Sequence, residues 1–267
     1  MQIDGSTEIF AIVGDPIKQV RTPGILNPLI QAVGRNAILL PFHVPERRFE
    51  EAIRGIMSLV NLGGLVITYP FKERSLALVD ELSERAEQIG GLNVMRRRHD
   101  GRWIGDMFDG VGLSRAVVAQ TPINGARVLL IGSGGAGRAI GLAFASEGAA
   151  AITVADIEPS RAEWLIERVQ AYYPGCDIRQ GPAVANGHDI IINATPIGMA
   201  PGDGLPAEIG PVTSTMTVVD IVPYPEITPL LAMAIAAGAK TIPGAAMTNG
   251  QASAILEFFG LDRQDGA

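Results

Sequence analysis

The chain has 267 residues, of which 47% are hydrophobic and 18% are charged, and its net charge is −7. These values predict a two-domain globular protein and argue against a nucleic-acid partner, because no basic stripe is present to neutralise phosphates. The single cysteine, Cys176, excludes an internal disulfide, the histidines show no metal-ligand spacing, and no apolar stretch reaches membrane-spanning length. We therefore expect a soluble, cytoplasmic protein that has no metal, no nucleic-acid or membrane partner, and is a monomer or homodimer.

The first part of the chain alternates short apolar runs with helical patterns. Strands are expected at 8–13, 37–42 and 65–68, helices at 23–33, from Pro45 onward and at 81–90, and a hairpin at 92–107. Thr22 is the expected N-cap of the first helix, with Pro23 in its first turn. The succession of strand, helix and strand predicts a domain with a parallel sheet.

The most informative stretch is a G-x-G-x-x-G that follows an apolar run and precedes a helical segment. It consists of Gly132, Ser133, Gly134, Gly135, Ala136 and Gly137. Such glycines permit a tight turn, close approach of a pyrophosphate and close packing of the helix, whose N-terminus attracts phosphates. Asp156 ends the next apolar run, 24 positions after Gly132, where an acid can accept hydrogen bonds from both ribose hydroxyls. We predict a dinucleotide site rather than a glycine-rich turn without a ligand.

Alternating elements continue to the end of the chain. A helix at 110–120 is expected to join the two halves, and Ser160 with Glu163 is expected to form the capping box of a helix that ends near residue 172. The remaining predicted elements are strands at 189–193, 217–222 and 239–243 and helices at 229–237 and 249–259.

A nicotinamide enzyme needs a group that exchanges a proton with the reacting hydroxyl. Lys72 follows a strand, and Asp109 lies where the first half of the chain leads into the second. A carboxylate can orient an ammonium group, and both can contact one hydroxyl, so the two residues form a sensible pair. The pattern alone leaves open that Lys72 is a surface lysine and that Asp109-Gly110 is a plain turn.

Several separated motifs resemble those of the shikimate and quinate dehydrogenases, in the same order and over nearly the whole chain. They are Gly14-Asp15-Pro16-Ile17 with Thr22-Pro23, Thr68-Tyr69-Pro70-Phe71-Lys72, Gly91-Leu92-Asn93, Gly105-Asp106 with Asp109-Gly110, Asn193-Ala194-Thr195-Pro196-Ile197-Gly198-Met199, Thr228-Pro229-Leu230-Leu231, and Gly244, Met247 and Gln251. One such motif means little, but together they make the chain similar to this family in particular.

The resemblance implies two α/β domains with an active-site cleft between them. The first covers residues 1–109 and, because the C-terminal helix folds back onto it, 244–267; the second, residues 110–243, is a Rossmann-type dinucleotide-binding domain. Lys72 and Asp109 are the implied catalytic pair, and Thr22, Thr68, Asn93 and Gln251 the implied substrate contacts. Further implied cofactor contacts are Ala194, Thr195, Val222, Gly244 and Met247. The implied reaction interconverts a ring hydroxyl and a ketone on shikimate or a related small cyclic carboxylic acid.

The chain departs from the family pattern at several positions that carry polar groups there. Val20 replaces the first serine of S-x-S, and Val66 replaces the asparagine of N-V-T. Met107 and Phe108 replace the Asn-Thr before the aspartate, and Pro223 stands where a tyrosine is usual, with Tyr224 one place later. Each lost hydrogen bond to a buried substrate group is worth about 1–3 kcal/mol. We therefore expect poor use of shikimate unless Thr22, Tyr69 or water compensates.

The cofactor end departs as well. Family members that use NADP carry Asn-Arg-Thr at the end of the strand that here leads to Asp156, and the matching positions of this chain are Ala155-Asp156-Ile157. A carboxylate repels a 2′-phosphate and suits two free hydroxyls, so NAD is favoured over NADP. The alternatives are a dehydrogenase for quinate or for an amino-substituted or less hydroxylated analogue, and a non-catalytic dinucleotide-binding regulator; both Lys72 and Asp109 being present argues against the regulator.

Overall fold

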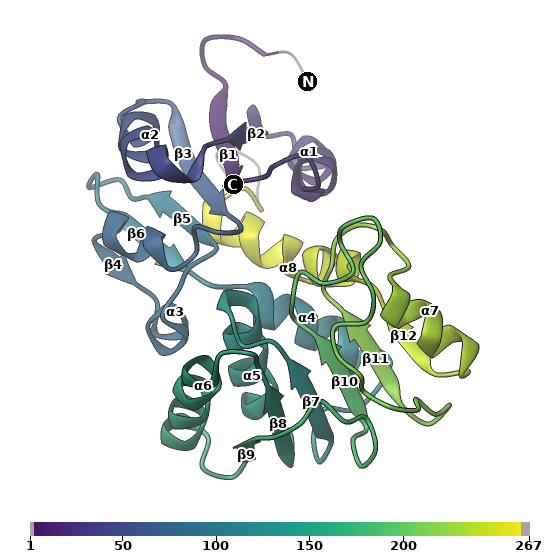
Figure 1. Ribbon diagram of the computed structural model, residues 1–267. Coiled ribbons are helices and arrows are strands. Elements are labelled where there is room, and N and C mark those ends of the chain that lie inside the picture. Colours follow the sequence, from purple (N-terminus) through teal and green to yellow (C-terminus); the bar gives the residue numbers. More distant parts are fainter. Residues whose placement is uncertain (1–2, 263–267) are drawn as a thin grey trace. The chain divides into compact units, whose positions relative to one another are not determined.

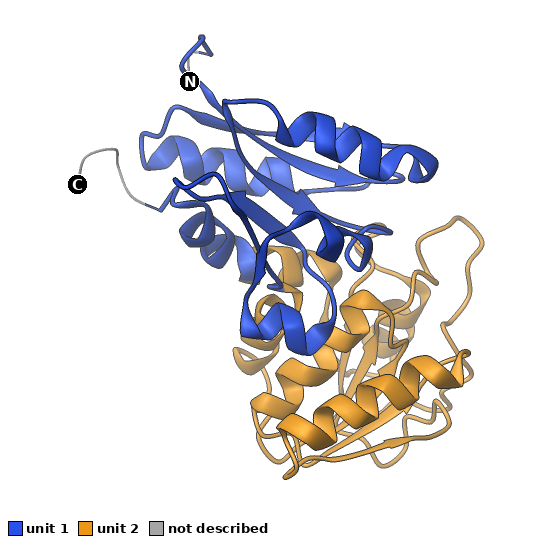
Figure 2. Cartoon of the chain, turned by 90° about the vertical axis from the view of Figure 1, so that its left-hand side faces the viewer, with its two compact units in different colours: residues 1–108, 251–267 blue, residues 109–250 orange. Residues whose placement is uncertain are grey.

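The computed structural model describes residues 3–262. The chain forms two compact units, unit 1 over Met1–Phe108 and Gln251–Ala267, and unit 2 over Asp109–Gly250 (Figure 2). Each unit has a sheet covered by helices (Figure 1), which confirms the predicted α/β class. The assignment of residues 1–109 and 244–267 to a substrate-binding domain, and of residues 110–243 to a dinucleotide-binding domain, stays a prediction. No helix among residues 3–262 is both long and apolar enough to cross a membrane.

Unit 1 has a mixed sheet in the order β2-β1-β3-β5-β6-β4. Its elements are β1 (Glu8–Gly14), α1 (Thr22–Ala32), β2 (Ala37–His43), the 3-10 turn η1 (Glu46–Arg48), α2 (Phe49–Met57), β3 (Leu62–Ile67), the 3-10 turn η2 (Arg74–Leu78), β4 (Glu81–Leu82), α3 (Glu84–Ile89), β5 (Val94–Arg97) and β6 (Trp103–Asp106). Strand β1 is parallel to β2 and β3, whereas β5 is antiparallel to both β3 and β6. Strands β1, β2, β3 and β6 therefore end at the same edge of the sheet, which is also the edge where β5 begins.

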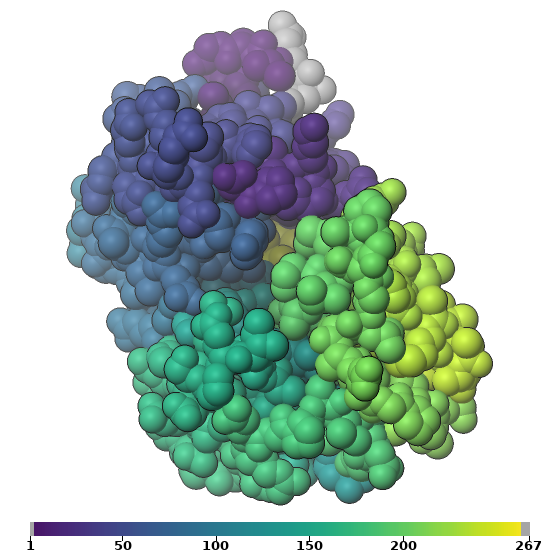
Figure 3. All heavy atoms as spheres, in the orientation of Figure 1, coloured from purple at the N-terminus to yellow at the C-terminus, as the bar shows by residue number. Residues whose placement is uncertain are grey.

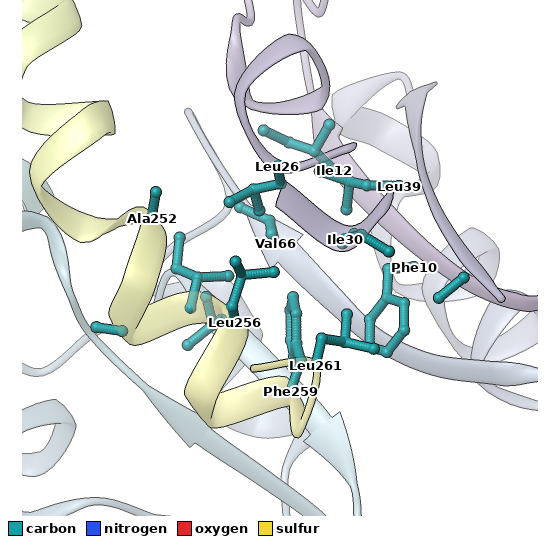
Figure 4. Packing of buried hydrophobic residues seen from close by; sticks show 14 of the residues in the cluster. Phe10, Ile12, Leu26, Ile30, Leu39, Val66, Ala252, Leu256, Phe259 and Leu261 are labelled. Atoms are coloured by element: carbon teal, nitrogen blue, oxygen red, sulfur yellow. The ribbon is translucent and has the colours of Figure 1, made fainter. Parts of the chain in front are cut away.

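The sheet of unit 1 is buried on both faces. Successive residues of a strand point to opposite sides, so neighbouring residues of β1 pack in different clusters. Phe10 and Ile12 of β1 pack in one cluster, which also contains residues of α1 and of the last helix, α8 (Gly244–Phe259), and which Figure 4 shows in detail. Ala11 and Val13 pack in the other cluster, against α2. We call the first one the α8-side cluster; its buried members are Phe10, Ile12, Leu26, Ile30, Ala37, Leu39, Val66, Val94, Phe108, Ala252, Ala254, Ile255, Leu256, Phe259 and Leu261.

Helix α2 covers the second face with one side only. Phe49 and Ile53 are fully buried, while Glu50, Glu51 and Arg54 are exposed, and the outer side of α2 lies at the surface in Figure 3. Such a division between an apolar and a charged side is what makes a helix pack on a sheet.

Unit 2 has a parallel sheet in the order β12-β11-β10-β7-β8-β9. Its elements are α4 (Asp109–Val118), β7 (Arg127–Ile131), α5 (Gly135–Ser146), β8 (Ala151–Ala155), α6 (Pro159–Tyr172), β9 (Asp177–Gln180), β10 (Ile190–Asn193), β11 (Thr217–Asp220), α7 (Pro229–Ala236), β12 (Lys240–Ile242) and the first part of α8. The strand order reverses between β7 and β10, and ligands of open α/β sheets bind at such a switch point, at the carboxyl ends of the strands.

Three predictions about helix starts were wrong. Arg21, not Thr22, is the N-cap of α1, and its side chain makes no cap hydrogen bond; Thr22 is already the first helical residue. The predicted Ser160–Glu163 capping box is not formed, because α6 already begins at Pro159, whose fixed φ suits the first turn, so that Ser160 lies inside the helix and Glu158 is the N-cap. The last helix begins at Gly244 rather than near residue 249.

The segment predicted as a helix at 81–90 is divided. Glu81–Leu82 forms a short edge strand beside β6, and Ser83 then caps α3 by accepting a hydrogen bond from the Ala86 amide at 3.1 Å. Neither this strand nor β9 was predicted, since edge strands of two to four residues carry too little hydrophobic pattern to be recognised.

Candidate active site and dinucleotide site

The residues predicted to hold the dinucleotide gather at the carboxyl edge of the unit 2 sheet. Gly132 follows β7, Asp156 follows β8, Ala194 and Thr195 follow β10, Val222 lies just beyond β11, and α8 begins at Gly244 immediately after β12 and Pro243. Two pairs of these segments touch. A Cβ atom at Gly132 would lie 2.7 Å from Thr195 Cγ2, and one at Gly244 would lie 2.3 Å from the Val222 carbonyl oxygen.

The glycine-rich loop has the form that a pyrophosphate requires. Gly132 has φ +90°, which favours glycine, and a Cβ at Gly137 would lie 2.1 Å from the Gly132 carbonyl oxygen. A Cβ at Gly134, in contrast, would have no described atom within 4 Å, so this glycine leaves open space. Helix α5 starts at Gly135, and its N-cap, Gly134, has no side chain to accept hydrogen bonds from the first turn. The first-turn N–H groups are therefore suited to an anionic ligand.

Asp156 is held in place by the same loop. Its Oδ2 accepts hydrogen bonds from the Ser133 amide at 2.6 Å and from Ser133 Oγ at 2.7 Å, and its Oδ1 accepts one from the Glu158 amide at 2.9 Å. Burial raises the pKa of Asp156, but these hydrogen bonds together outweigh it and hold the pKa below the ordinary 3.8. The carboxylate is therefore ionised and fixed at the tip of β8. Because the Ser133 hydroxyl can rotate, Oδ2 can also accept from a ligand hydroxyl.

A buried hydrogen-bond network that the sequence did not predict supports the loops after β10 and β11. Asp220 is fully buried and accepts hydrogen bonds from Asn193 Nδ2 at 3.0 Å, the Val222 amide at 3.1 Å and Thr228 Oγ1 at 2.7 Å. Asn193 Oδ1 in turn accepts from the amide and the hydroxyl of Thr195. Burial raises the pKa of Asp220, and the hydrogen bonds from the three donors oppose that rise.

In unit 1 the predicted substrate contacts lie near the edge where β3 and β6 end and β5 begins. Thr68 follows β3, and Asn93 immediately precedes β5. Asn93 is 2% exposed, accepts a hydrogen bond from the Phe108 amide at 2.9 Å and donates one to Gln251 Oε1 at 2.8 Å. Tertiary structure thus brings together two predicted contacts that lie 158 positions apart. Thr22, the fourth predicted contact, is buried in the first turn of α1.

Lys72 lies in a turn whose main chain is tightly fixed. The Thr68 amide donates to the Val13 carbonyl at 2.9 Å, and the Lys72 carbonyl accepts from the Leu92 amide at 3.0 Å. Between them, Phe71 is fully buried and stacks on Phe49 with ring centroids 4.0 Å apart. The turn therefore presents the partly buried Lys72 side chain from a rigid base.

The chain segment that precedes Asp109 is held in place by an ion pair that the sequence did not predict. Asp106 accepts two hydrogen bonds from Arg85, at 3.1 and 2.8 Å, and one from the Met107 amide at 2.7 Å. The Arg85 guanidinium also lies 4.7 Å from the centre of the Phe108 ring. The next residue, Asp109, is 2% exposed and begins α4 in unit 2. Lys72 belongs to unit 1, so its pairing with Asp109 stays a prediction.

Val20 and Val66 are in an apolar environment. Val66 is a buried member of the α8-side cluster, and Val20 packs against that cluster; Phe108 belongs to it as well. Three positions at which the family carries polar side chains are thus joined to one hydrophobic core. None of these side chains can bond a polar substituent of a substrate.

Two family models match the chain. The shikimate dehydrogenase substrate binding domain matches residues 12–95, and the shikimate / quinate 5-dehydrogenase model matches residues 115–199. Shikimate dehydrogenase (NADP(+)) of Methanopyrus kandleri is 32% identical over 97% of this chain and 92% of that protein.

Solved structures agree with the family models. Shikimate 5-dehydrogenase of Listeria monocytogenes, in complex with shikimate and NAD, is 25% identical with a TM-score of 0.86, covering 99% of this chain and 96% of that chain. 5-Ketofructose reductase of Gluconobacter sp. strain CHM43 is 28% identical with a TM-score of 0.82, covering 95% of this chain and 92% of that chain. The predicted family is confirmed: the chain belongs to the shikimate dehydrogenase family and is an NAD(P)-dependent oxidoreductase that acts on a CH–OH group.

Proposed function

We propose that this enzyme uses NAD to interconvert a ring hydroxyl and a ketone on a cyclic hydroxy acid related to shikimate but with fewer polar substituents. The observation that carries the proposal is the fixed carboxylate of Asp156 at the tip of β8, held by both hydrogen-bonding groups of Ser133. Bound NAD supplies the acceptor for the hydride, and the residues of this chain supply orientation and proton transfer.

The choice of NAD rests on charge and on hydrogen bonding. An ionised Asp156 can accept hydrogen bonds from the ribose hydroxyls, whereas a 2′-phosphate at the same place is repelled. The name of the Methanopyrus kandleri relative gives NADP(+), while the Listeria monocytogenes relative was crystallised with NAD, so members of the family differ in the cofactor with which they are described. The charge at position 156 is the feature of this chain that favours NAD.

Lys72 is the proposed proton donor and acceptor, and Asp109 is proposed to orient both the ammonium group and the reacting hydroxyl. Thr22, Thr68, Asn93 and Gln251 are the proposed substrate contacts. The hydrogen bond between Asn93 and Gln251 supports this assignment, because it holds the amide groups of two of these residues side by side, although they lie 158 positions apart in the chain.

Shikimate is proposed to be a poor substrate because of Val20 and Val66. A polar substituent that meets a valine loses its water without gaining a partner. Two such losses, at about 1–3 kcal/mol each, lower kcat/KM by roughly 10²- to 10⁴-fold. The 5-ketofructose reductase among the related structures supports a substrate other than shikimate, since its name shows that this fold also serves a different carbonyl compound.

The proposal is tested by a spectrophotometric dehydrogenase assay with NAD and with NADP over a panel of cyclohexane and cyclohexene carboxylates, including shikimate, quinate and an amino-substituted ring. We expect turnover of a less hydroxylated ring with NAD, and loss of that turnover in Lys72→Ala. A clear preference for NADP contradicts the cofactor assignment, and efficient use of shikimate contradicts the substrate assignment. Size-exclusion chromatography and cell fractionation test the predicted monomeric or homodimeric state and the predicted cytoplasmic location.

A further inference from the structure

Tyr69 is a large aromatic residue that unit 1 leaves in solvent, with 66% of its surface exposed. It follows β3 directly, between Thr68 and the Pro70-Phe71-Lys72 turn. The other large hydrophobic side chains of the described part of unit 1 that are similarly exposed are Ile3, Leu29, Leu59 and Val60. Leu59 and Val60 precede β3 and so lie at its opposite end, and Ile3 and Leu29 lie outside the turn.

The main chain on both sides of Tyr69 is fixed, so its exposure does not result from a loose segment. The Tyr69 carbonyl accepts a hydrogen bond from the Asp15 amide at 3.0 Å, and the Phe71 amide donates to the Thr68 carbonyl at 3.0 Å. A Cβ at Gly14 would lie 2.5 Å from Thr68 Cγ2 and 3.1 Å from the Tyr69 carbonyl oxygen, so β1 packs directly against this turn.

The side of the turn that faces the interior is equally rigid. Arg74 lies over the Phe71 ring at 5.7 Å and over the Phe49 ring at 5.1 Å, and it pairs with Glu50 at 2.6 Å. The turn therefore buries Phe71 completely, partly buries Thr68 and Lys72, and exposes Tyr69. A rigid base that carries an exposed aromatic ring is suited to packing against a ligand, because little conformational freedom is lost on binding.

We infer that Tyr69 is a substrate-contacting residue whose ring packs on the hydrocarbon face of the six-membered ring of the substrate. The inference rests on the proposed function, which assigns the neighbouring Thr68 and Lys72 to the substrate. It adds an apolar contact at the end of β3, where Val66 offers no polar group. An aromatic face suits a ring with few hydroxyl groups better than a fully hydroxylated one, since less water must be displaced from polar groups.

The test compares Tyr69→Ala and Tyr69→Phe with the wild-type enzyme, and uses Tyr172→Ala, a change of a 44% exposed tyrosine at the end of α6, as the matched control. We expect Tyr69→Ala to raise the KM for the best ring acid about tenfold, as expected for the loss of an area of about 60 Å² of apolar contact. Tyr69→Phe and Tyr172→Ala should stay within twofold of wild type. The affinity for NAD, measured by fluorescence quenching, should be unchanged in all variants.

Circular dichroism and thermal unfolding distinguish a substrate contact from a purely structural role of Tyr69. The spectrum and the unfolding temperature of Tyr69→Ala should equal those of the wild type. An unchanged KM in Tyr69→Ala overturns the inference but not the proposed function, and a tenfold loss in Tyr69→Phe overturns the ring contact in favour of the hydroxyl. Calorimetric titration of the same ring acids into the enzyme with NADH present does not require turnover. Normal binding without turnover contradicts the proposed function alone, and equal binding by wild type and Tyr69→Ala again overturns the inference.

Discussion

The clearest consequence of the fold for substrate choice concerns Val66. It is 5% exposed and packs in the α8-side cluster, where Figure 4 shows it with Ile12 of β1, Leu26 of α1 and Leu256 of α8. We predict that Val66→Asn destabilises the free protein while improving the use of shikimate. Both effects have the same cause, because the new amide lacks partners in the core and finds one only in a polar substrate.

The size of each effect follows from the burial of Val66. Removing a buried valine costs about 1.5–3 kcal/mol, and leaving a buried amide unpaired costs about 1–3 kcal/mol. The sum, roughly 2.5–6 kcal/mol, should lower the unfolding temperature by roughly 5–24 °C. One regained hydrogen bond to shikimate should raise kcat/KM by roughly 10- to 100-fold, and Val20→Ser in addition should raise it further.

The assay is steady-state oxidation of shikimate with NAD, accompanied by thermal unfolding with and without shikimate. Leu39→Asn is the matched control, since Leu39 is buried in the same cluster but lies within β2. It should lose stability without any gain for shikimate. A wild-type kcat/KM near 10⁵ M⁻¹s⁻¹, on the order of the usual enzyme value, would show that the valines do not limit the reaction. An equal gain in Leu39→Asn would refute the reasoning as well.

Further predictions concern the proton-transfer pair, the cofactor and the cysteine. Lys72→Ala should lower kcat by roughly 10² or more with little change in NAD affinity, and a double variant with Asp109→Asn should be far from additive in single-turnover kinetics. Turnover of Lys72→Ala within a few-fold of wild type would contradict the assignment. Asp156→Asn should narrow the ratio of kcat/KM for NAD to that for NADP; because its pKa lies below 3.8, the wild-type ratio should not change between about pH 6 and 9. Burial raises the pKa of Cys176 from 9.0 to about 11, so its reaction with a thiol reagent at pH 8 should be about 100-fold slower in the native than in the unfolded protein. A fast native reaction would show that Cys176 is accessible as a thiolate.

Local sequence patterns determined much of this protein. The apolar strand at 8–13 and the apolar strands before Gly132 and Asp156 could be recognised because they depend only on residues close together in the chain. The glycine-rich loop was recognisable for the same reason, since Gly132 and Gly137 are required by their immediate surroundings.

Other features depended on sheet order and register, which bring distant residues together. The hydrogen bond between Asn93 and Gln251 joins residues 158 positions apart, and the pairing of Arg85 with Asp106 joins α3 to the end of β6. These pairings could not be deduced from the sequence neighbours of each residue, because a hydrogen bond depends on where both partners lie in the fold.

At the helix ends, too, the sequence predicted the approximate position, and the tertiary structure decided which residue begins the helix. The patterns predicted Thr22 and Ser160 as N-caps. Both residues instead lie inside their helices, which begin at Thr22 and at Pro159. A capping side chain competes with the conformation that the preceding loop already has, and the packing of that loop decides the outcome. Asp220 is the extreme case: it lay inside the strand predicted at 217–222, but only the tertiary structure shows that it ends β11 and that three donors surround its buried side chain.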